Sequence, residues 1–137
     1  DHPHFAISRI DIDRPGPHYA VDMIRLLHDA MPDADIYFLM GSDSFHDLPG
    51  WNRPAELIEA CRIVVLDRPG RAWSPTMHAA IFPTLAERTV TITYPRLGIS
   101  STEVSRRLNA GLSVRYLVPA AVLEYIEEHE LYTRARE

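Results

Sequence analysis

Hydrophobic and polar positions along the chain fall into blocks that predict strands and helices in alternation. Residues 36–40 and 62–66 are short apolar runs, typical of strands buried on both faces between layers. Residues 89–94 alternate between polar and apolar positions, as does the stretch 5–12. The pattern therefore predicts four strands, with the first of them half-buried.

Helical spacing appears between and after these strands. It predicts helices over residues 19–31, 52–60, 100–111 and 119–129, with at most a short helical stretch around 77–82. Proline ends the first helix and opens the second and fourth, and an S-x-x-E capping box opens the third. The expected inner faces consist of Ala20, Ile24, Leu27, Met31, Val104, Leu108, Val122 and Ile126.

This order of elements predicts an α/β fold, with a mostly parallel sheet and helices on both faces. The 137 residues are close to the roughly 150 that make one domain, so we expect a single domain over residues 1–137. Ligands of such sheets bind beyond the carboxyl ends of the strands. The segments to consider for a site are therefore 41–43, 67–70 and 97–102.

Composition narrows the classes of partner. The net charge of -5 argues against long nucleic acids, and all 14 basic residues are arginines, which suit a small phosphorylated ligand. The longest apolar run is far shorter than the ~20 residues that span a bilayer, so no membrane association is expected. A lone cysteine, Cys61, favours the reducing cytoplasm.

Three segments offer candidate binding groups, each with a purely structural alternative. Ser100, Ser101 and Thr102 at a helix start could hold a phosphate, or Ser100 could simply cap the helix. Arg106, one turn later on the same face, favours the phosphate. Gly41 followed by Asp43 could receive a ribose, or could form a turn in which the carboxylate caps the next helix. The segment after it carries Trp51, which could stack on a flat ring or pack as ordinary core.

Several short segments, taken together, indicate the function more specifically than any one residue does. They are YFLMGSDS at 37–44, LPGW at 48–51, RPG at 68–70, ISST at 99–102, YLVP at 116–119 and YI at 125–126. This set closely resembles bacterial nicotinate-nucleotide adenylyltransferases, from about residue 5 to residue 132. The ISST segment alone marks only the wider nucleotidyltransferase superfamily, whereas its combination with G-x-D-S and P-x-W is far more specific.

The resemblance implies a Rossmann-like nucleotidyltransferase fold and an enzyme that joins ATP to nicotinate mononucleotide, forming deamido-NAD and pyrophosphate in NAD biosynthesis. Magnesium would accompany the ATP. By position, Trp51 resembles the residue that stacks on the pyridine ring, and the backbone at Tyr19–Ala20 and Asn52 resembles the part that reads its carboxylate. The resemblance also implies that Gly41 and Asp43 line the nucleotide groove. The residues that it implies for ATP binding are Arg68, Ile99, Ser100, Ser101 and Thr102.

The sequence departs from the family in two places. The family opens with a strand, loop and helix containing G-x-F-D-P-x-H-x-G-H, and no H-x-G-H occurs in the 137 residues. We therefore expect the opening βα portion to be missing, residues 1–137 to be the C-terminal two-thirds of the domain, and this piece to be inactive alone. Ser105 also stands where the family has an arginine, so Arg106 is the candidate to reach the phosphates instead.

Two other functions remain open. A related transferase acting on nicotinamide mononucleotide or phosphopantetheine would share the Ser-Ser-Thr segment, but would not require Trp51 after Pro49 and Gly50. A non-catalytic nucleotide-binding remnant would fit the missing H-x-G-H and Ser105. The sequence upstream of Asp1 distinguishes the two: a glycine-rich H-x-G-H element found there would indicate an enzyme and not a remnant.

Overall fold

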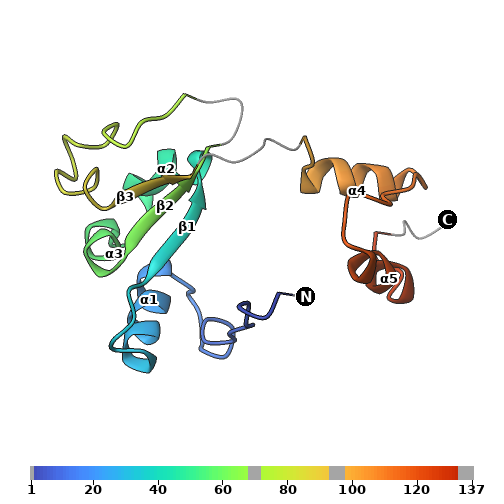
Figure 1. Ribbon diagram of the computed structural model, residues 1–137, viewed down its shortest axis with the longest axis horizontal. Coiled ribbons are helices and arrows are strands. Elements are labelled where there is room, and N and C mark those ends of the chain that lie inside the picture. The colour runs from blue at the N-terminus through green and yellow to red at the C-terminus, as the bar shows by residue number, and fades with distance from the viewer. Residues whose placement is uncertain (1, 68–71, 93–97, 133–137) are drawn as a thin grey trace. The chain divides into compact units, whose positions relative to one another are not determined.

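Two units make up the structure, a computed structural model that describes residues 2–67, 72–92 and 98–132 (Figure 1). The first unit, Asp1–Pro95, contains α1 (Ala20–Ala30), β1 (Tyr37–Gly41), α2 (Ser42–Asp47), the 3-10 turn η1 (Leu48–Gly50), α3 (Pro54–Ala60), β2 (Arg62–Leu66) and β3 (Thr89–Ile92). The second unit, Arg96–Glu137, contains α4 (Ser101–Asn109) and α5 (Ala120–Glu128). A single domain over residues 1–137 stays a prediction.

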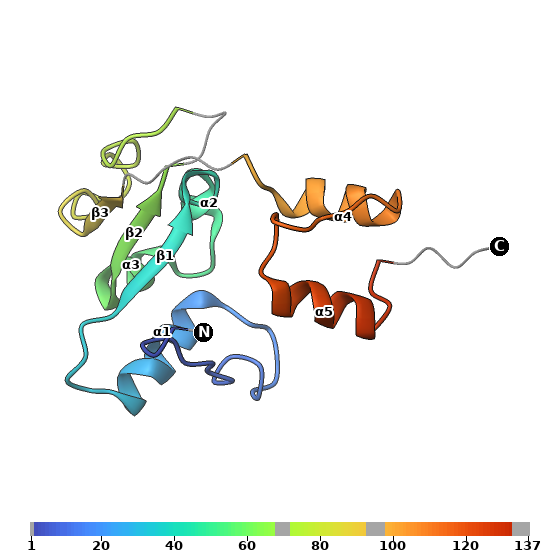
Figure 2. The ribbon, with the colours of Figure 1, turned by 45° about the vertical axis from the view of Figure 1, so that its right-hand side comes forward.

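The sheet of the first unit is parallel, with the strands in the order β1-β2-β3 (Figure 2). Leu39 pairs with Val64 and Val64 with Val90, so the carboxyl ends of the strands lie at one edge of the sheet. Branched side chains at residues 63–65 favour the extended conformation of the central strand. The parallel sheet and its buried central strand confirm the predicted α/β class.

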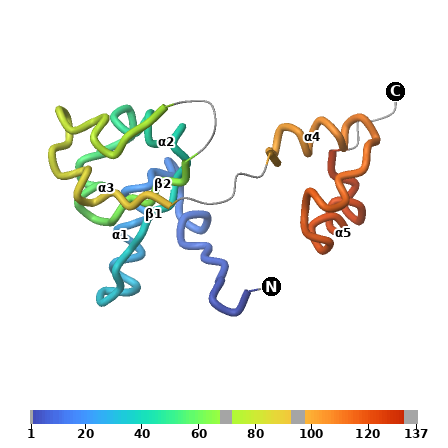
Figure 3. Tube along the Cα trace, turned by 45° about the horizontal axis from the view of Figure 1, so that its top comes forward, coloured from blue at the N-terminus to red at the C-terminus, as the bar shows by residue number. Residues whose placement is uncertain are grey.

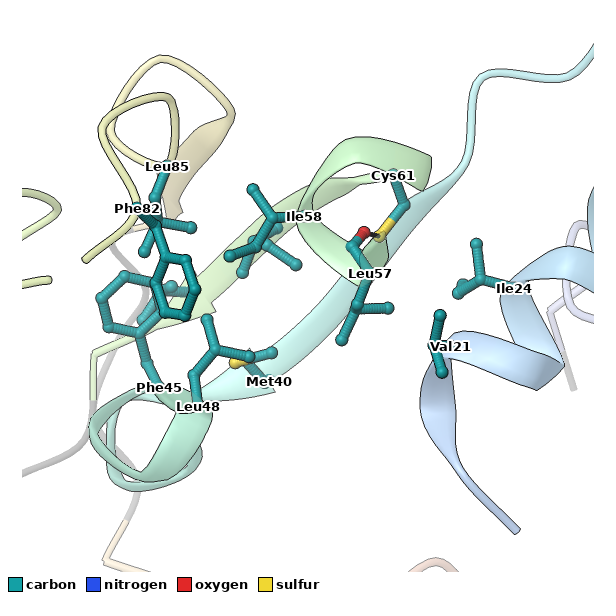
Figure 4. Packing of buried hydrophobic residues seen from close by; sticks show 12 residues of the cluster. Val21, Ile24, Met40, Phe45, Leu48, Leu57, Ile58, Cys61, Phe82 and Leu85 are labelled. Carbon is teal, nitrogen blue, oxygen red and sulfur yellow. Dashed lines mark hydrogen bonds between the residues drawn. The ribbon is translucent and has the colours of Figure 1, made fainter. Parts of the chain in front are cut away.

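A hydrophobic cluster joins one face of this sheet to the helices (Figure 4). Leu57 of α3 lies between the sheet and the side chains of Val21 and Ile24 on α1, and Phe45 of α2 packs at the other end. The buried members are Val21, Ile24, Met40, Phe45, Leu48, Leu57, Ile58, Cys61, Ile63, Val65, Phe82 and Leu85. Fully burying one such side chain stabilises the fold by about 1.5–3 kcal/mol, so this cluster holds the strand ends in place.

The strand predicted for residues 5–12 is wrong. The chain there forms turns instead, visible as the irregular blue trace in Figure 3, and the N–H groups of Ile12 and Asp13 both donate to the Arg9 carbonyl oxygen at 2.9 Å. Phe5 and Ile7 are 83% and 97% exposed. Alternation supplies a face, but a strand also needs a neighbour for its backbone, and here local bonds take those groups.

Burial on both faces of β1 is a second incorrect prediction. Tyr37 and Leu39 are 48% and 58% exposed, whereas Met40 is buried. The helices of this unit pack on the face that carries Phe38 and Met40, and successive side chains of a strand point to opposite faces. The other face therefore carries exposed apolar side chains in the described structure.

Helix positions are predicted better than their inner faces. α1, α3, α4 and α5 all form, whereas residues 75–81 form turns and α2 follows β1 directly where a polar loop is expected. In α1 the buried positions are Val21 and Ile24, and Met31 is 47% exposed because it is already the C-cap. Val122 on α5 is 44% exposed, and Ile126 is the residue of that helix that is buried.

The second unit is a pair of helices lying alongside each other, α5 next to α4 (Figure 2). α4 ends before Gly111, whose φ of +68° suits glycine, and Pro119 precedes α5. Val114, in the connection, is buried. A hollow of about 830 Å³ remains between the helices, lined by apolar residues that include Leu108, Leu112 and Leu123.

Candidate functional site

The carboxyl end of β1 passes directly into α2. Gly41 is the last residue of the strand and the N-cap of the helix, with an extended φ of -75°. Ser42 is buried in the first turn, and Asp43 follows in the same turn with its side chain exposed. A carboxylate in the first turn is favoured by the helix dipole. The structure thus brings Gly41 and Asp43 together at the strand end, where the sequence places a nucleotide groove.

Two histidines fix the segment that follows β2 against α2. The Nε2–H of His46 donates to the carbonyl oxygen of Ala72 at 2.8 Å, and that of His78 donates to the carbonyl oxygen of Phe45 at 2.9 Å. Sequence reasoning passes over both, because lone histidines carry no spacing signal. Their role here is to satisfy carbonyl groups and hold residues 72–82 beside the strand ends.

Arg68 lies outside the described residues. The residue before it, Asp67, follows β2 and accepts a hydrogen bond at 3.1 Å from Nε1 of Trp73. The rings of Trp73 and Phe45 meet in a T-shaped arrangement with their centroids 5.5 Å apart. The start of the connection after β2 is therefore held by the same core residue of α2 that the second histidine contacts.

Trp51 stands at the end of η1, immediately before α3. Its backbone N–H donates to the Leu48 carbonyl oxygen at 3.1 Å, and its half-buried ring meets Phe38 of β1 edge-on with centroids 6.0 Å apart. Asn52, next in the chain, is exposed. Part of the indole is thus packed in the protein, and the ring keeps part of its surface open to solvent.

The start of α1 carries Tyr19 and Ala20, the other residues implied in pyridine recognition. Tyr19, 39% exposed, is its N-cap and has no side-chain cap hydrogen bond, and Ala20 is the first helical residue. The Arg14 guanidinium donates to the Tyr19 carbonyl oxygen at 3.3 Å and to that of Pro17 at 2.8 Å. The first backbone N–H groups of a helix have no partner within it, so this end can donate to an anion.

Four charged side chains tie the start of α1 to the start of α3. Arg53 pairs with Asp22, and Arg25 pairs with Glu56. The cross pairs are longer, at 3.9 Å between Arg25 and Asp22 and at 4.0 Å between Arg53 and Glu56. Arg53 also donates from Nε to Oδ1 of Asn52 at 2.9 Å. The two segments implied in pyridine recognition, 19–20 and 51–52, are therefore connected.

The second unit holds the remaining site residues, which lie together at the start of α4. Ser100 is the N-cap, and its Oγ accepts from the Glu103 N–H at 3.1 Å, which confirms the helix cap. Ile99, Ser101 and Thr102 are exposed beside it. Exposed hydroxyls next to the first N–H groups of a helix form an arrangement that can accept a phosphate.

Arg106 is engaged with a neighbour on the same helix. Its guanidinium donates to both carboxylate oxygens of Glu103, at 2.8 and 2.7 Å. This hydrogen bond, with the nearby charge, lowers the pKa of Glu103 and raises the pKa of Arg106. Arg106 as a phosphate ligand stays a prediction.

Among residues 2–67, 72–92 and 98–132, no group of three or more His, Cys, Asp or Glu side chains is arranged to hold a metal ion. Within those same ranges no helix is both long and apolar enough to cross a membrane.

Comparison with known proteins places this arrangement in a family. Residues 2–107 match the cytidylyltransferase-like family. The chain is 44% identical over 132 residues to a probable nicotinate-nucleotide adenylyltransferase of Roseiflexus sp. (strain RS-1), covering 96% of this chain and 66% of that protein. It is 40% identical over 132 residues to the protein of that name from Herpetosiphon aurantiacus, covering 96% of this chain and 67% of that one.

A solved structure agrees at the level of fold. The chain superposes on Plasmodium falciparum nicotinic acid mononucleotide adenylyltransferase, complexed with APC, with a TM-score of 0.67 at 18% identity, covering 93% of this chain and 64% of that one. The fold is thus the Rossmann-like nucleotidyltransferase fold. The chain spans about two-thirds of the length of the curated relatives it matches. It belongs to the cytidylyltransferase-like family and, within it, to the nicotinate-nucleotide adenylyltransferase family.

Proposed function

We propose that the full-length protein transfers the adenylyl group of ATP to nicotinate mononucleotide, giving deamido-NAD and pyrophosphate. The observation that carries this proposal is Trp51, a half-buried indole beside the tied starts of α1 and α3, in a chain 40–44% identical to relatives named for this activity. A pyridinium ring carries positive charge, which suits the face of an indole. Its carboxylate suits the N–H donors at Tyr19–Ala20 and Asn52.

In the proposed reaction, a phosphate oxygen of the mononucleotide attacks the α-phosphorus of ATP. The bond from that phosphorus to the β-phosphate oxygen breaks, and pyrophosphate leaves with its electrons. The protein must chiefly align two anions and stabilise the charge that spreads to the leaving group. We assign the ATP side to Arg68 and to residues 99–102 at the start of α4, and the ribose side to Gly41 and Asp43.

We propose that magnesium enters with ATP. No group of three or more His, Cys, Asp or Glu side chains in the described residues is arranged to hold a metal ion. In this proposal the oxygens of the triphosphate are the ligands of the ion. Bound to the triphosphate, the ion would neutralise part of its charge. The steps assigned to this chain's residues are binding and alignment.

We also propose a cytoplasmic location. Cys61 is the one cysteine of the sequence, and its Sγ donates to the Leu57 carbonyl oxygen at 3.2 Å inside the core. Burial raises the pKa of this thiol to about 11, so it stays protonated and unreactive at neutral pH. A chain with a single, protected thiol suits a reducing compartment.

The test is pyrophosphate release by the full-length protein with ATP, magnesium and one of three acceptors: nicotinate mononucleotide, nicotinamide mononucleotide or phosphopantetheine. We expect kcat/KM to be highest for the nicotinate compound. Preference for another acceptor assigns the related transferase function instead, and no turnover with any of them assigns a non-catalytic remnant. Residues 1–137 alone are expected to give only trace turnover.

A substitution at Trp51 makes the test specific. Trp51→Ala should raise the KM for the mononucleotide by about tenfold, because stacking on a cationic ring is worth on the order of 1 kcal/mol or more. The KM for ATP should change by less than about twofold. Trp73→Phe is the control, since it replaces the other tryptophan and keeps an aromatic ring against Phe45. Equal losses for both substrates would return Trp51 to a packing role.

A further inference from the structure

Arg53 does more at the start of α3 than join two helices. Its guanidinium has two hydrogen-bond partners, the Asp22 carboxylate in the first turn of α1 and Oδ1 of Asn52, the residue before it. We infer that Arg53 is a positioning residue, which holds the Trp51–Asn52 turn against the start of α1 and so sets the affinity for the mononucleotide. This inference rests on the proposed function.

The backbone at Arg53 supports this reading. Arg53 has φ 48° and ψ 54°, the left-handed conformation that side chains with a β-carbon rarely adopt. Pro54 follows at the first helical position, where its fixed φ suits the start of a helix. An unfavourable backbone conformation persists only where the surroundings hold it, and here the side chain of the same residue supplies the bonds.

The geometry of the guanidinium explains why arginine stands here. Nε donates to Asn52 at 2.9 Å while a terminal nitrogen binds Asp22, so one rigid plane fixes two partners at a set separation. Because Nε donates to the Asn52 oxygen, this bond favours one orientation of the Asn52 amide and with it this conformation of the turn. A lysine could keep the charge opposite Asp22 but could not make both bonds in one plane.

Arg25 provides a matched control within the same network. It pairs with Glu56 and lies 3.9 Å from Asp22, so it also links α1 to α3. Its bonds are to carboxylates of the two helices, whereas Arg53 alone of this pair also bonds Asn52. Its side chain is 53% exposed against 34% for Arg53. Loss of Arg25 therefore reports on the helix link, and loss of Arg53 on the link together with the turn.

The experiment compares Arg53→Asn, Arg53→Lys and Arg25→Gln in the full-length protein. Asparagine tolerates the left-handed conformation, so the backbone of the turn can persist. We expect Arg53→Asn and Arg53→Lys to raise the KM for nicotinate mononucleotide by about tenfold while kcat and the KM for ATP change by less than about twofold. Arg25→Gln should leave all three within about twofold. An equal rise for Arg25→Gln, or none for Arg53→Asn, overturns the inference.

A double-mutant cycle tests whether Arg53 acts through Asn52. Asn52→Ala should raise the mononucleotide KM like Arg53→Asn, and the double variant should be no worse than either single one. Additive losses would show that the two residues act independently and would overturn the inference. Asn52→Ala also keeps the test valid if Arg53→Asn lowers the yield of folded protein.

A readout without turnover separates this inference from the proposed function. With Trp73→Phe as background, Trp51 is the one tryptophan left, and acrylamide quenching reports on how firmly it is held. We expect Arg53→Asn to increase quenching and Arg25→Gln to leave it unchanged. If wild type turns over no pyridine mononucleotide but this difference holds, the function fails and the positioning stands. If turnover is normal and quenching is unchanged by Arg53→Asn, only the positioning fails.

Discussion

At the scale of single residues, the charged groups of α4 are already paired with one another. Arg106 binds both oxygens of Glu103, and Arg107 lies 3.8 Å from the same carboxylate. The lowered pKa of Glu103 means that this carboxylate stays charged at neutral pH and loses the pairing only as pH falls through its folded-state pKa. A phosphate at the start of α4 must therefore compete with Glu103 for Arg106.

Arg106→Ala should lower kcat of the full-length enzyme by about tenfold. In our proposal the positive charge of Arg106 stabilises the leaving pyrophosphate more than it stabilises the bound substrates, and the variant lacks this charge. Thermal stability should barely change, since the pair with Glu103 is exposed. Steady-state rates for wild type, Arg106→Ala, Ser105→Arg and the double variant test this.

In the double variant, Ser105→Arg should restore part of the lost rate, because residues 105 and 106 both lie near the face of Thr102. An Arg106→Ala enzyme as fast as wild type would show that the charge is supplied elsewhere, with Arg107 the next residue to replace.

Single-sequence reasoning finds local bonds and misses distant ones. The cap at Ser100 is predicted because its partner is three residues away, and the structure shows that bond. The pair between Arg53 and Asp22 spans 31 positions, and no spacing rule connects them. The left-handed backbone conformation of Arg53 cannot be predicted from the sequence either, because the residues that usually adopt this conformation are glycine and asparagine.

At the scale of elements, helix ends are predicted well and strand surroundings poorly. Proline and the capping box mark the starts of α3, α4 and α5, since these signals act on the backbone nearby. α2 is missed because Gly41 suggests a loop, although the chain goes straight from strand to helix. The false strand over residues 5–12 shows that alternation alone does not supply a pairing partner.

The start of α4 separates capping from phosphate binding. Ser100→Ala should destabilise this helix by about 1 kcal/mol, because Oγ caps the Glu103 N–H. Ser101→Ala should leave stability unchanged, because this hydroxyl is exposed. It should raise the KM for ATP by several-fold if, as we propose, the hydroxyl binds the phosphate. Thermal unfolding and ATP kinetics of both variants decide the matter. An unchanged ATP KM for Ser101→Ala would leave α4 with a cap and no assigned ligand.

At the scale of the whole molecule, the hydrophobic cluster explains why the strand ends are ordered. One cluster joins α1, α2 and α3 to the same face of a parallel sheet. The cluster therefore holds the carboxyl ends of β1 and β2, from which the following segments start. The class of fold follows from the alternation of elements, as the sequence predicts. The one-sided burial of β1 does not, because an apolar run looks the same whether one face or two are covered.

The exposed face of β1 has a consequence for how this chain behaves in solution. β1 is the first strand of the described sheet, with β2 on one side, and its Tyr37 and Leu39 side chains are 48% and 58% exposed. An open strand edge beside apolar side chains is a template on which other chains assemble. We expect preparations of residues 1–137 to self-associate as concentration rises, and Leu39→Arg to reduce this because like charges on the strand repel. Sedimentation velocity over a range of concentrations would measure this self-association. A wild-type chain that stays monomeric at every concentration would contradict the prediction.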